Sequence, residues 1–429
     1  MTGRAEVERA VADAHRREWA TLLASTVRTT RNLDVAEECV QEAFAAALTT
    51  WGRTGIPSHP GAWLTTAARR RAIDAVRREA ALRPKLPLLV ISDATSGDGV
   101  GSHDRWDDGT VLVDERLRLI FMSCHPALAA DAQLALTLRL VCGIPTADVA
   151  RALLVSESTM GARLTRAKRK IAIARIPVRV PSAAELPDRL SSVLGVVHLV
   201  FSLGYAAPSG GALQRVDLMD EAVRLARVLH QLMPDEREVG GLLALLLATD
   251  ARRATRVGAD GSPTTLDRQD RTKWDRAMLS ESHDLIVAGL RGARPGRYVL
   301  QAAIASLHAE APTFADTDWV QILRLYDELL VAWPSPVVAL NRAVALSMTA
   351  GPGAALDVVD ALDRDGRLAG YHYLPAVRAD LLRRLGRTEE AVAADRLALS
   401  LAANEAERGL LAERLEGARP AGSSRDAPT

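Results

Sequence analysis

Apolar residues recur at steps of three and four along most of this 429-residue chain, and that spacing constrains the fold more than any other feature. The period places apolar side chains on one side of an α-helix, whereas a half-buried strand alternates at every second residue. The composition agrees, because alanine, leucine and arginine are abundant while Phe and Tyr number only 4 and 5. The sequence therefore predicts an all-α protein, and its length predicts several domains rather than one core.

The helix predicted over residues 34–44 has an apolar face and an acidic face. Its apolar stripe consists of Leu33, Ala36, Val40, Ala43 and Ala47. Off that stripe lie Glu37, Glu38, Gln41 and Glu42. We expect Asp34 and Glu37 to form a capping pair at its N-terminus. An acidic or amide outer face of this kind suits docking on a charged partner protein, and the alternative is an ordinary solvated surface.

A near-neutral net charge of +1 hides two short basic segments. The first has five arginines and one acid between Arg69 and Arg78, on a helix predicted over residues 62–79. Trp51 and Trp63 flank the loop that leads into this helix. Basic grooves with stacking aromatics bind single-stranded nucleic acid, at about 1–3 kcal/mol per stacked base. The alternatives are a solvated basic face and tryptophans that pack in a core.

The second basic segment, between Arg151 and Arg175, includes a pattern typical of a helix-turn-helix over residues 146–171. We expect Thr146 to cap the first helix and Ser156 to cap the second. The second helix has an apolar seam of Met160, Leu164, Ala167 and Ile171. A helix of this kind enters the major groove, where its N-terminal residues reach base edges. The candidates for such contacts are Glu157, Ser158, Thr159 and Arg163, and the basic residues Arg166, Lys168, Arg169 and Lys170 lie further along the helix.

Proline, glycine and acidic residues divide the chain into five predicted parts. These are a helical domain over 1–80, an acidic flexible linker over 81–113, a helix-turn-helix domain over 114–177, a helical extension over 183–416 and a disordered tail over 417–429. Within the extension, residues 375–399 loosely echo residues 336–362. Their offset of roughly 36 to 37 residues is close to a tetratricopeptide period, so we expect a tetratricopeptide-like fold there.

No catalytic residue, metal ligand or cofactor site is predicted. Cys124, His125 and Cys142 do not have the spacing of a tetrahedral metal site, and His198 in an apolar helix fits a core position. A cluster in the extension mixes acids, bases and an aromatic residue: Asp267, Gln269, Asp270, Arg271, Trp274, Asp275 and Arg276. Because the cluster lacks a paired nucleophile and base or a phosphate loop, we interpret it as an internal ion-pair network or an effector site.

The chain is expected to be cytoplasmic and not bound to a membrane. Three cysteines are too few for a disulfide framework, which favours a reducing compartment. Acidic residues near the N-terminus, including Glu6 and Glu8, fall where a signal peptide requires an apolar core. The longest apolar runs are well short of the ~20 residues that span a bilayer.

The ordered motifs resemble sigma-70-type factors of the extracytoplasmic-function group. DVAEECVQEAFAAALTTW is similar to the region 2 helix that docks on RNA polymerase, and AWLTTAARRRAIDAVRRE is similar to the helix that melts and reads the −10 element. TADVARALLVSESTMGARLTRAKRKI resembles region 4, which reads the −35 element. DERLRLIFMSCHPAL and several stretches downstream resemble the subgroup with a tetratricopeptide-like C-terminal extension.

This resemblance implies three sets of contacts, with core RNA polymerase (the beta-prime clamp and the beta flap) and promoter DNA as partners. The polymerase-binding residues would be Asp34, Glu37, Glu38, Gln41 and Glu42. The −10 contacts would be Trp63, Arg69, Arg70, Arg71, Arg77 and Arg78. The −35 contacts would be Glu157, Ser158, Thr159, Arg163, Arg166, Lys168 and Arg169. The chain departs from the family at Arg70, where many relatives have asparagine, and over residues 201–205, which read Phe-Ser-Leu-Gly-Tyr instead of Phe-Asn-Glu-Gly-Tyr.

We therefore predict a non-enzymatic sigma factor that directs promoter-specific transcription initiation. Its C-terminal helical domain would regulate that activity, through a protein or a small-molecule regulator. The alternative is a helix-turn-helix transcriptional regulator with a helical ligand- or protein-sensing domain, which leaves the helices over 34–44 and 62–79 without a role. A third hypothesis is an all-helical enzyme or scaffold that uses a cleft in the extension.

Overall fold

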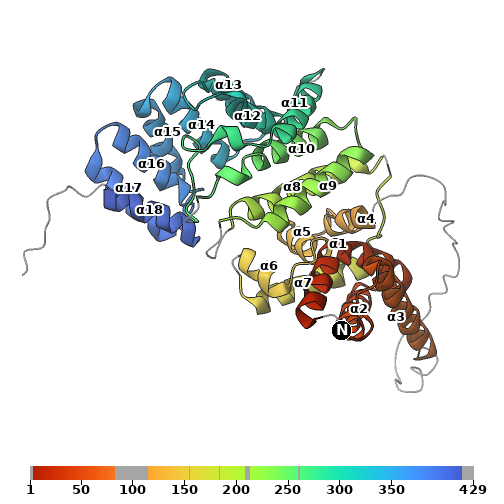
Figure 1. Cartoon of the computed structure of the whole chain (residues 1–429). Helices are drawn as coiled ribbons and strands as arrows, with labels where there is room; N and C mark the ends of the chain where they lie inside the picture. Colours follow the sequence, from red (N-terminus) through yellow and green to blue (C-terminus); the bar gives the residue numbers. More distant parts are fainter. Residues whose placement is uncertain are drawn as a thin grey trace, which may run out of the picture. The chain divides into compact units, whose positions relative to one another are not determined.

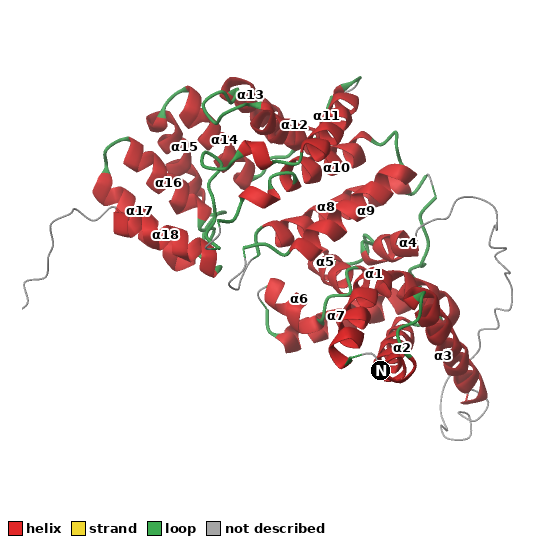
Figure 2. Ribbon diagram, in the orientation of Figure 1, coloured by secondary structure: helices red, strands yellow, loops and turns green. Residues whose placement is uncertain are grey.

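The computed structural model describes residues 3–82, 115–153, 155–182, 184–207, 213–258, 261–292 and 294–417. Within these ranges every regular element is a helix, and the only β-type pairing is an isolated bridge between Val257 and Pro263 (Figure 2). The all-α prediction is confirmed. The chain separates into two compact units, Met1–Val196 and Val197–Thr429, and the division falls inside helix α8 (Leu186–Tyr205). Most of the predicted linker (83–113) and of the predicted tail (418–429) lies outside the described residues.

The first half of unit 1 is a bundle of three long helices that all contact one another: α1 (Arg4–Thr30), α2 (Leu33–Thr54) and α3 (Pro60–Leu82). The apolar stripe predicted along α2 is buried at every position. The predicted cap is wrong, because α2 begins at Leu33 and its N-cap is Asn32. The Asn32 side chain accepts hydrogen bonds from the backbone amides of Asp34 and Val35, so the Asp34–Glu37 pair has no capping role.

The second half of unit 1 consists of short helices that end in a helix-turn-helix. They are α4 (Glu115–Ser123), α5 (Ala130–Leu136), the π-helix η2 (Thr137–Val141), α6 (Thr146–Ala152) and α7 (Glu157–Ile173). Ser156 caps α7 as predicted, because its hydroxyl accepts the Thr159 amide. Thr146 is the first residue of α6 and does not cap it, since the N-cap position belongs to Pro145. The predicted seam of α7 is buried along its whole length.

The two halves of unit 1 pack together around Trp19. This side chain is 2% exposed, and its indole Nε1 donates to the carbonyl of Leu140 at 3.2 Å. Gly143 follows η2 with a φ of +68°, a conformation that other residues rarely adopt. A Cβ atom at this glycine would lie only 3.0 Å from Trp19 Cδ1. Glycine therefore allows the turn after η2 to lie directly on the α1 tryptophan.

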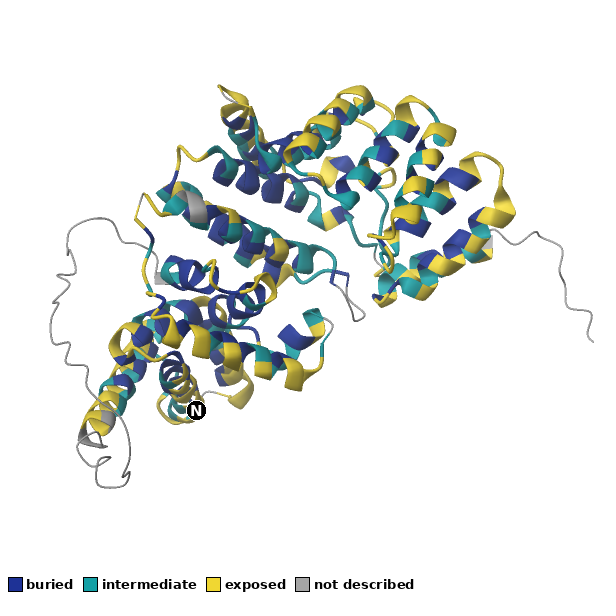
Figure 3. Cartoon of the chain, turned by 180° about the vertical axis from the view of Figure 1, so that it is seen from behind, coloured by how far each residue is buried: buried dark blue, intermediate teal, exposed yellow. Residues whose placement is uncertain are grey.

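Unit 2 begins with helices packed around α10 (Arg237–Asp250), which is buried on nearly all sides. Its neighbours are α9 (Val216–Leu232), α11 (Arg276–Leu290) and α12 (Arg297–Glu310). Across the described helices, exposed residues face outward while buried residues face neighbouring helices (Figure 3). Such one-sided burial is the arrangement that the three- and four-residue apolar period predicts.

The remaining helices of unit 2 pack one after another in chain order (Figure 1). They are α13 (Trp319–Ala332), α14 (Pro336–Thr349), α15 (Pro352–Asp365), α16 (Tyr373–Arg384), α17 (Thr388–Leu401) and α18 (Glu405–Gly417). The echoed sequences fall on two successive helix pairs, α14–α15 and α16–α17. Each pair shares a buried core with the next, as helical repeats do.

A hydrogen bond joins the two ends of unit 2. The Asn404 side chain, 1% exposed, donates to the carbonyl of Ala207 at 2.8 Å. The same side chain caps α18, because its oxygen accepts the amides of Ala406 and Glu407. The residue directly before α18 is therefore fixed to the segment directly after α8.

Candidate functional site

The acidic face of α2 divides into an exposed part and a buried part. Asp34, Glu38, Gln41 and Glu42 are exposed, as the periodicity predicts. Glu37 differs, because it is only 5% exposed. Four of the five predicted docking residues are therefore accessible in unit 1.

Glu37 is buried because two basic side chains from the second half of unit 1 pair with it. Arg139 in η2 places Nη2 at 2.9 Å from Glu37 Oε1, and the Lys168 ammonium in α7 contacts Oε2. Lys168 also lies 2.8 Å from Asp34 Oδ1. Burial alone would lower the pKa of Lys168, but its hydrogen bonds to Asp34 and Glu37 outweigh burial and raise that pKa. The ammonium group thus stays charged inside the interface.

The basic face of α3 is largely open to solvent. Arg69, Arg70, Arg77 and Arg78 are exposed. Arg71 differs, because its Nε donates to Glu42 Oε2 at 2.9 Å. This pair connects the basic face of α3 to the acidic face of α2.

The two tryptophans, Trp51 near the end of α2 and Trp63 near the start of α3, have different roles. Trp51 is 1% exposed and belongs to the core of the bundle. Trp63 is partly exposed and meets Trp51 edge to face, with ring centroids 5.7 Å apart. Trp51 therefore fixes the position of Trp63, and only Trp63 can reach a base.

The predicted DNA-reading residues of α7 fall into two groups. Glu157, Ser158, Thr159, Arg166 and Arg169 are exposed. The other two members point into unit 1. Arg163 lies 3.3 Å from Asp131 in α5, and Lys168 contacts α2 as described above. In this arrangement only the five exposed residues of α7 can contact a DNA duplex.

The polar cluster in the extension is held mainly by hydrogen bonds to backbone and hydroxyl groups. Trp274 Nε1 donates to Thr255 Oγ1 at 2.9 Å. Arg271 Nη1 donates at 2.6 Å to the carbonyls of both His308 and Ala311, at the C-terminal end of α12. Asp270 lies 3.4 Å from Lys273, and Asp275 caps α11. The interpretation as an ion-pair network is wrong for Arg271, which fixes the loop between α10 and α11 to the end of α12. The Trp274 hydrogen bond lies within that loop.

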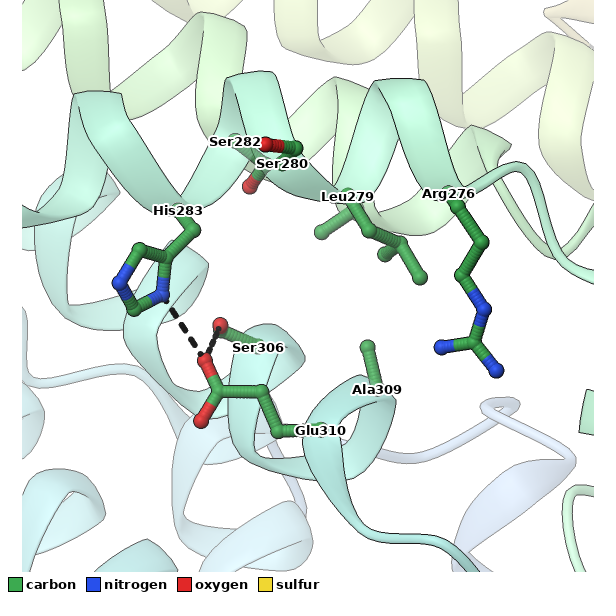
Figure 4. Close-up of a pocket in the computed structure, with 9 residues that line it drawn as sticks. Arg276, Leu279, Ser280, Ser282, His283, Ser306, Ala309 and Glu310 are labelled. Atoms are coloured by element: carbon green, nitrogen blue, oxygen red, sulfur yellow. Dashed lines mark hydrogen bonds and ion pairs between the residues drawn. The ribbon is translucent and has the colours of Figure 1, made fainter.

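A pocket of about 270 Å³ lies between α11 and α12 and has a hydroxyl-rich lining (Figure 4). Ser306 donates to Glu310 at 2.6 Å, and His283 Nδ1 lies 3.2 Å from the same carboxylate oxygen. The Ser306 hydroxyl therefore donates to the Glu310 carboxylate, and the Ser–His pair of a catalytic triad is not formed.

The three cysteines are free thiols in different environments. Cys124 is fully buried with Sγ 3.7 Å from Thr137 Oγ1, and burial raises the pKa of its thiol to about 12. Cys39 is buried and Cys142 is partly exposed. Within the described ranges, no group of three or more His, Cys, Asp or Glu side chains is placed to hold a metal ion. A search of the same residues finds no helix long and apolar enough to cross a membrane.

Sequence reasoning missed the residues that join the two halves of unit 1. They include Trp19, Arg139 and Gly143, and the Trp19–Leu140 hydrogen bond links positions 121 residues apart. Arg139 also lies over the Trp19 ring, 5.3 Å from its centroid. No local motif marks such a contact, although a glycine directly after an apolar helical run is a signal for a special turn.

Comparison with known proteins identifies three segments of the chain. Sigma-70 region 2 matches residues 10–81, which form most of α1 to α3. Sigma-70 region 4 matches residues 118–171, and a family of unknown function, DUF6596, matches residues 189–289. An uncharacterized protein from Rhizobium meliloti (strain 1021) is 44% identical over 397 residues, which is 92% of each chain. No solved structure matches the chain.

Proposed function

The chain belongs to the sigma-70 family of RNA polymerase sigma factors, and from that premise we propose that it is an extracytoplasmic-function type whose C-terminal helical extension regulates it. A sigma factor of this family binds core RNA polymerase and promoter DNA. Support for the type comes from the domain order, since the region 4 match begins at residue 118, soon after the region 2 match ends at residue 81. Residues 82–117 separate the two matches.

The proposed polymerase contact is the exposed acidic face of α2. Glu38, Gln41 and Glu42 lie on the side opposite the buried stripe, so they can meet a partner without repacking the bundle. Asp34 and Glu37 would join this contact only after Lys168 leaves them. Exposed charges of this kind steer association and define orientation more than they add affinity.

The proposed promoter contacts lie on α3 and α7. Around the −10 element, Arg69, Arg70, Arg77 and Arg78 would follow the phosphates while Trp63 stacks on an unpaired base. At the −35 element, the capped N-terminus of α7 would enter the major groove with Glu157, Ser158 and Thr159 near base edges. Arg166 and Arg169 would contact the backbone and set the salt dependence.

One observation carries this proposal. The residues of all three proposed surfaces lie in unit 1, and the proposed −35 surface meets the proposed polymerase surface at Lys168. One proposed promoter contact pairs with two proposed polymerase contacts, Asp34 and Glu37. These contacts exclude one another, because the same ammonium group cannot face the carboxylates and DNA at once. We infer that the arrangement described is a closed state and that assembly with polymerase separates α7 from α2.

A reconstitution experiment tests the sigma function. Purified protein is mixed with core RNA polymerase and a promoter fragment, and complex formation and run-off transcripts are measured. The expected result is a stable complex that starts transcription at a defined position on the promoter fragment. Failure to bind core polymerase would overturn the proposal. Duplex binding without polymerase would instead favour a helix-turn-helix regulator whose helical domain senses a ligand or protein.

Two truncations test regulation by the extension. Unit 1 continues to Val196, and Arg189 in α8 donates to the Phe121 carbonyl at 3.4 Å, so the first half of α8 is part of unit 1. One variant therefore ends at residue 196 and the other at residue 182. Both are compared with the full chain in run-off transcription. A changed transcript yield supports regulation in cis, whereas equal yields from all three proteins would contradict it.

A further inference from the structure

Three arginines in the loop between α10 and α11 have no acidic partner. Arg252, Arg256 and Arg271 have no carboxylate oxygen within 4.0 Å anywhere in the described part of the chain. Their neighbour Arg253 shows the usual arrangement, with Asp220 at 2.6 Å and Asp250 at 2.7 Å. Arg253 is therefore neutralised, whereas Arg252, Arg256 and Arg271 are not.

Two aromatic rings keep these guanidinium groups close together. Arg256 lies 3.4 Å from the centroid of the Tyr205 ring, and Arg252 Nη2 lies 3.5 Å from the Tyr205 hydroxyl. Trp274 is flanked by Arg252 at 5.9 Å and Arg271 at 5.0 Å from its centroid. Such cation–π contacts are electrostatic attractions between the guanidinium group and the face of the ring. The rings attract the cations but leave their net charge in place.

The group also includes buried polar atoms that lack a hydrogen-bond partner. Arg271 is 9% exposed, and its Nη2 has no partner, although its Nη1 donates twice. Arg252 Nε and His308 Nδ1 also lack a hydrogen-bond partner. A buried N–H donor without a partner is energetically unfavourable, so the N–H groups at Arg252 Nε and Arg271 Nη2 require an acceptor.

His308 belongs to the same charged neighbourhood. Burial, followed by the positive charges of Arg252 and Arg271, lowers the pKa of its imidazole to about 4. The negative charge of Asp316 acts to raise the pKa of Arg271, although the two side chains form no ion pair. Positive charge thus accumulates here without a counter-charge in contact.

A purely structural role explains part of this arrangement. Arg271 caps the C-terminal end of α12, where the carbonyls of His308 and Ala311 carry partial negative charge. This role accounts for Nη1 of Arg271. It does not account for Nη2 of Arg271 or for Arg252, whose Nε points to no acceptor.

We propose that Arg252 and Arg271, with His308 beside them, form a binding site for a small oxyanion, a phosphate or carboxylate group of a soluble ligand. Guanidinium groups bind such anions through parallel N–H donors, and an oxyanion would supply both the missing acceptor and the missing charge. Both guanidinium groups also lie near the Trp274 ring. Only an effect of this ligand on transcription rests on the proposed function; binding itself is a property of the extension.

Calorimetric titration of the full chain tests the site without polymerase. Inorganic phosphate and succinate are the probes, and sodium chloride of equal ionic strength is the blank. We expect saturable heat with at least one probe, and at least a tenfold weaker Kd in Arg252→Gln. Arg367→Gln is the matched control, because Arg367 is an exposed arginine of the same unit that pairs with Asp365 at 2.8 Å. Absence of saturable heat in the parent protein, or equal affinity in Arg252→Gln, would overturn the proposal.

Thermal unfolding separates a binding role from a packing role. Without oxyanion, Arg252→Gln is expected to keep or raise the Tm, because it removes repulsion among the three arginines. With phosphate, the parent protein should gain Tm as bound ligand stabilises the folded state, and the variant should not. Arg271→Lys provides a second variant that keeps the charge but loses the planar fork. A lower Tm in Arg252→Gln together with an unchanged phosphate response would show that these arginines serve packing alone.

Discussion

Lys168 in α7 donates a hydrogen bond to Asp34 in α2 at 2.8 Å and contacts Glu37 one turn later. This contact joins a helix proposed to read promoter DNA to a helix proposed to dock on polymerase. Neither surface is therefore fully available while the contact persists. The affinity of the protein for polymerase should include the free energy of separating them, because only the open fraction offers Asp34 and Glu37 together with the rest of the docking face.

Arg139→Gln should promote opening without changing a proposed polymerase or promoter contact. Arg139 pairs with buried Glu37, and its own side chain is 14% exposed. Loss of that partner destabilises the closed arrangement, and a change of 1.4 kcal/mol would tighten apparent core binding about tenfold. Fluorescence anisotropy with labelled protein measures the Kd. Arg9→Gln, on the exposed side of α1, is the control, and an unchanged Kd in both variants would contradict the closed state.

Glu38→Lys should weaken core polymerase binding by roughly tenfold or more while leaving unfolding unchanged. Glu38 is exposed on α2, so reversing its charge alters the docking face without disturbing the core. Asp284→Lys makes the same change on an exposed position of α11 and should bind polymerase normally. Equal binding by the two variants would place the docking surface elsewhere.

Arg166→Ala should reduce initiation only at promoters that contain a −35 element. Its side chain is exposed on α7, whereas Arg163 already pairs with Asp131. Loss of one phosphate contact should also reduce the slope of log K against log salt by about one. Run-off transcription on promoters with and without the element provides the comparison. An equal loss on both promoters would refute the assignment of Arg166.

Acid should destabilise the extension through His198. Its imidazole packs against Tyr298, with ring centroids 5.6 Å apart, and burial followed by the charge of Arg297 lowers its pKa from 6.5 to about 4. The unfolded chain therefore binds a proton first, so stability is complete above pH 6.5 and declines as the pH falls toward 4. By pH 5 the loss is about 2 kcal/mol. Urea unfolding at pH 7 and pH 5 should show a smaller difference in His198→Phe, and identical differences would exclude this histidine as the cause.

Local patterns predicted the helices and their buried faces well, because these depend on residues three and four apart. The stripe of α2 and the seam of α7 are buried as predicted, and Ser156 caps α7. Two other caps failed. Asn32 takes the position expected for Asp34, and Pro145 precedes the helix that Thr146 was expected to cap. Several adjacent side chains can accept a hydrogen bond from the same backbone amide, so sequence alone does not identify the residue at which the helix begins.

The candidate site was harder to predict from the sequence, because its geometry depends on contacts between residues far apart in the chain. The period of α2 correctly placed Glu38 and Glu42 on the outside, but it also placed Glu37 there. Glu37 is buried by Arg139 and Lys168, which are more than a hundred residues away in sequence. The arginines of the α10–α11 loop show the same limit, since their lack of acidic partners becomes visible only in three dimensions.

The hydrogen bond from Asn404 to Ala207 changes how the extension should lose its structure. A linear array of helical repeats frays from its ends, because each repeat depends only on its neighbours. Here the last helix holds the chain beside the first, so removal of α18 withdraws support from both ends at once. The extension should therefore unfold as one cooperative body, and proteolytic removal of its C-terminal helix should destabilise the whole extension and not only its last repeat.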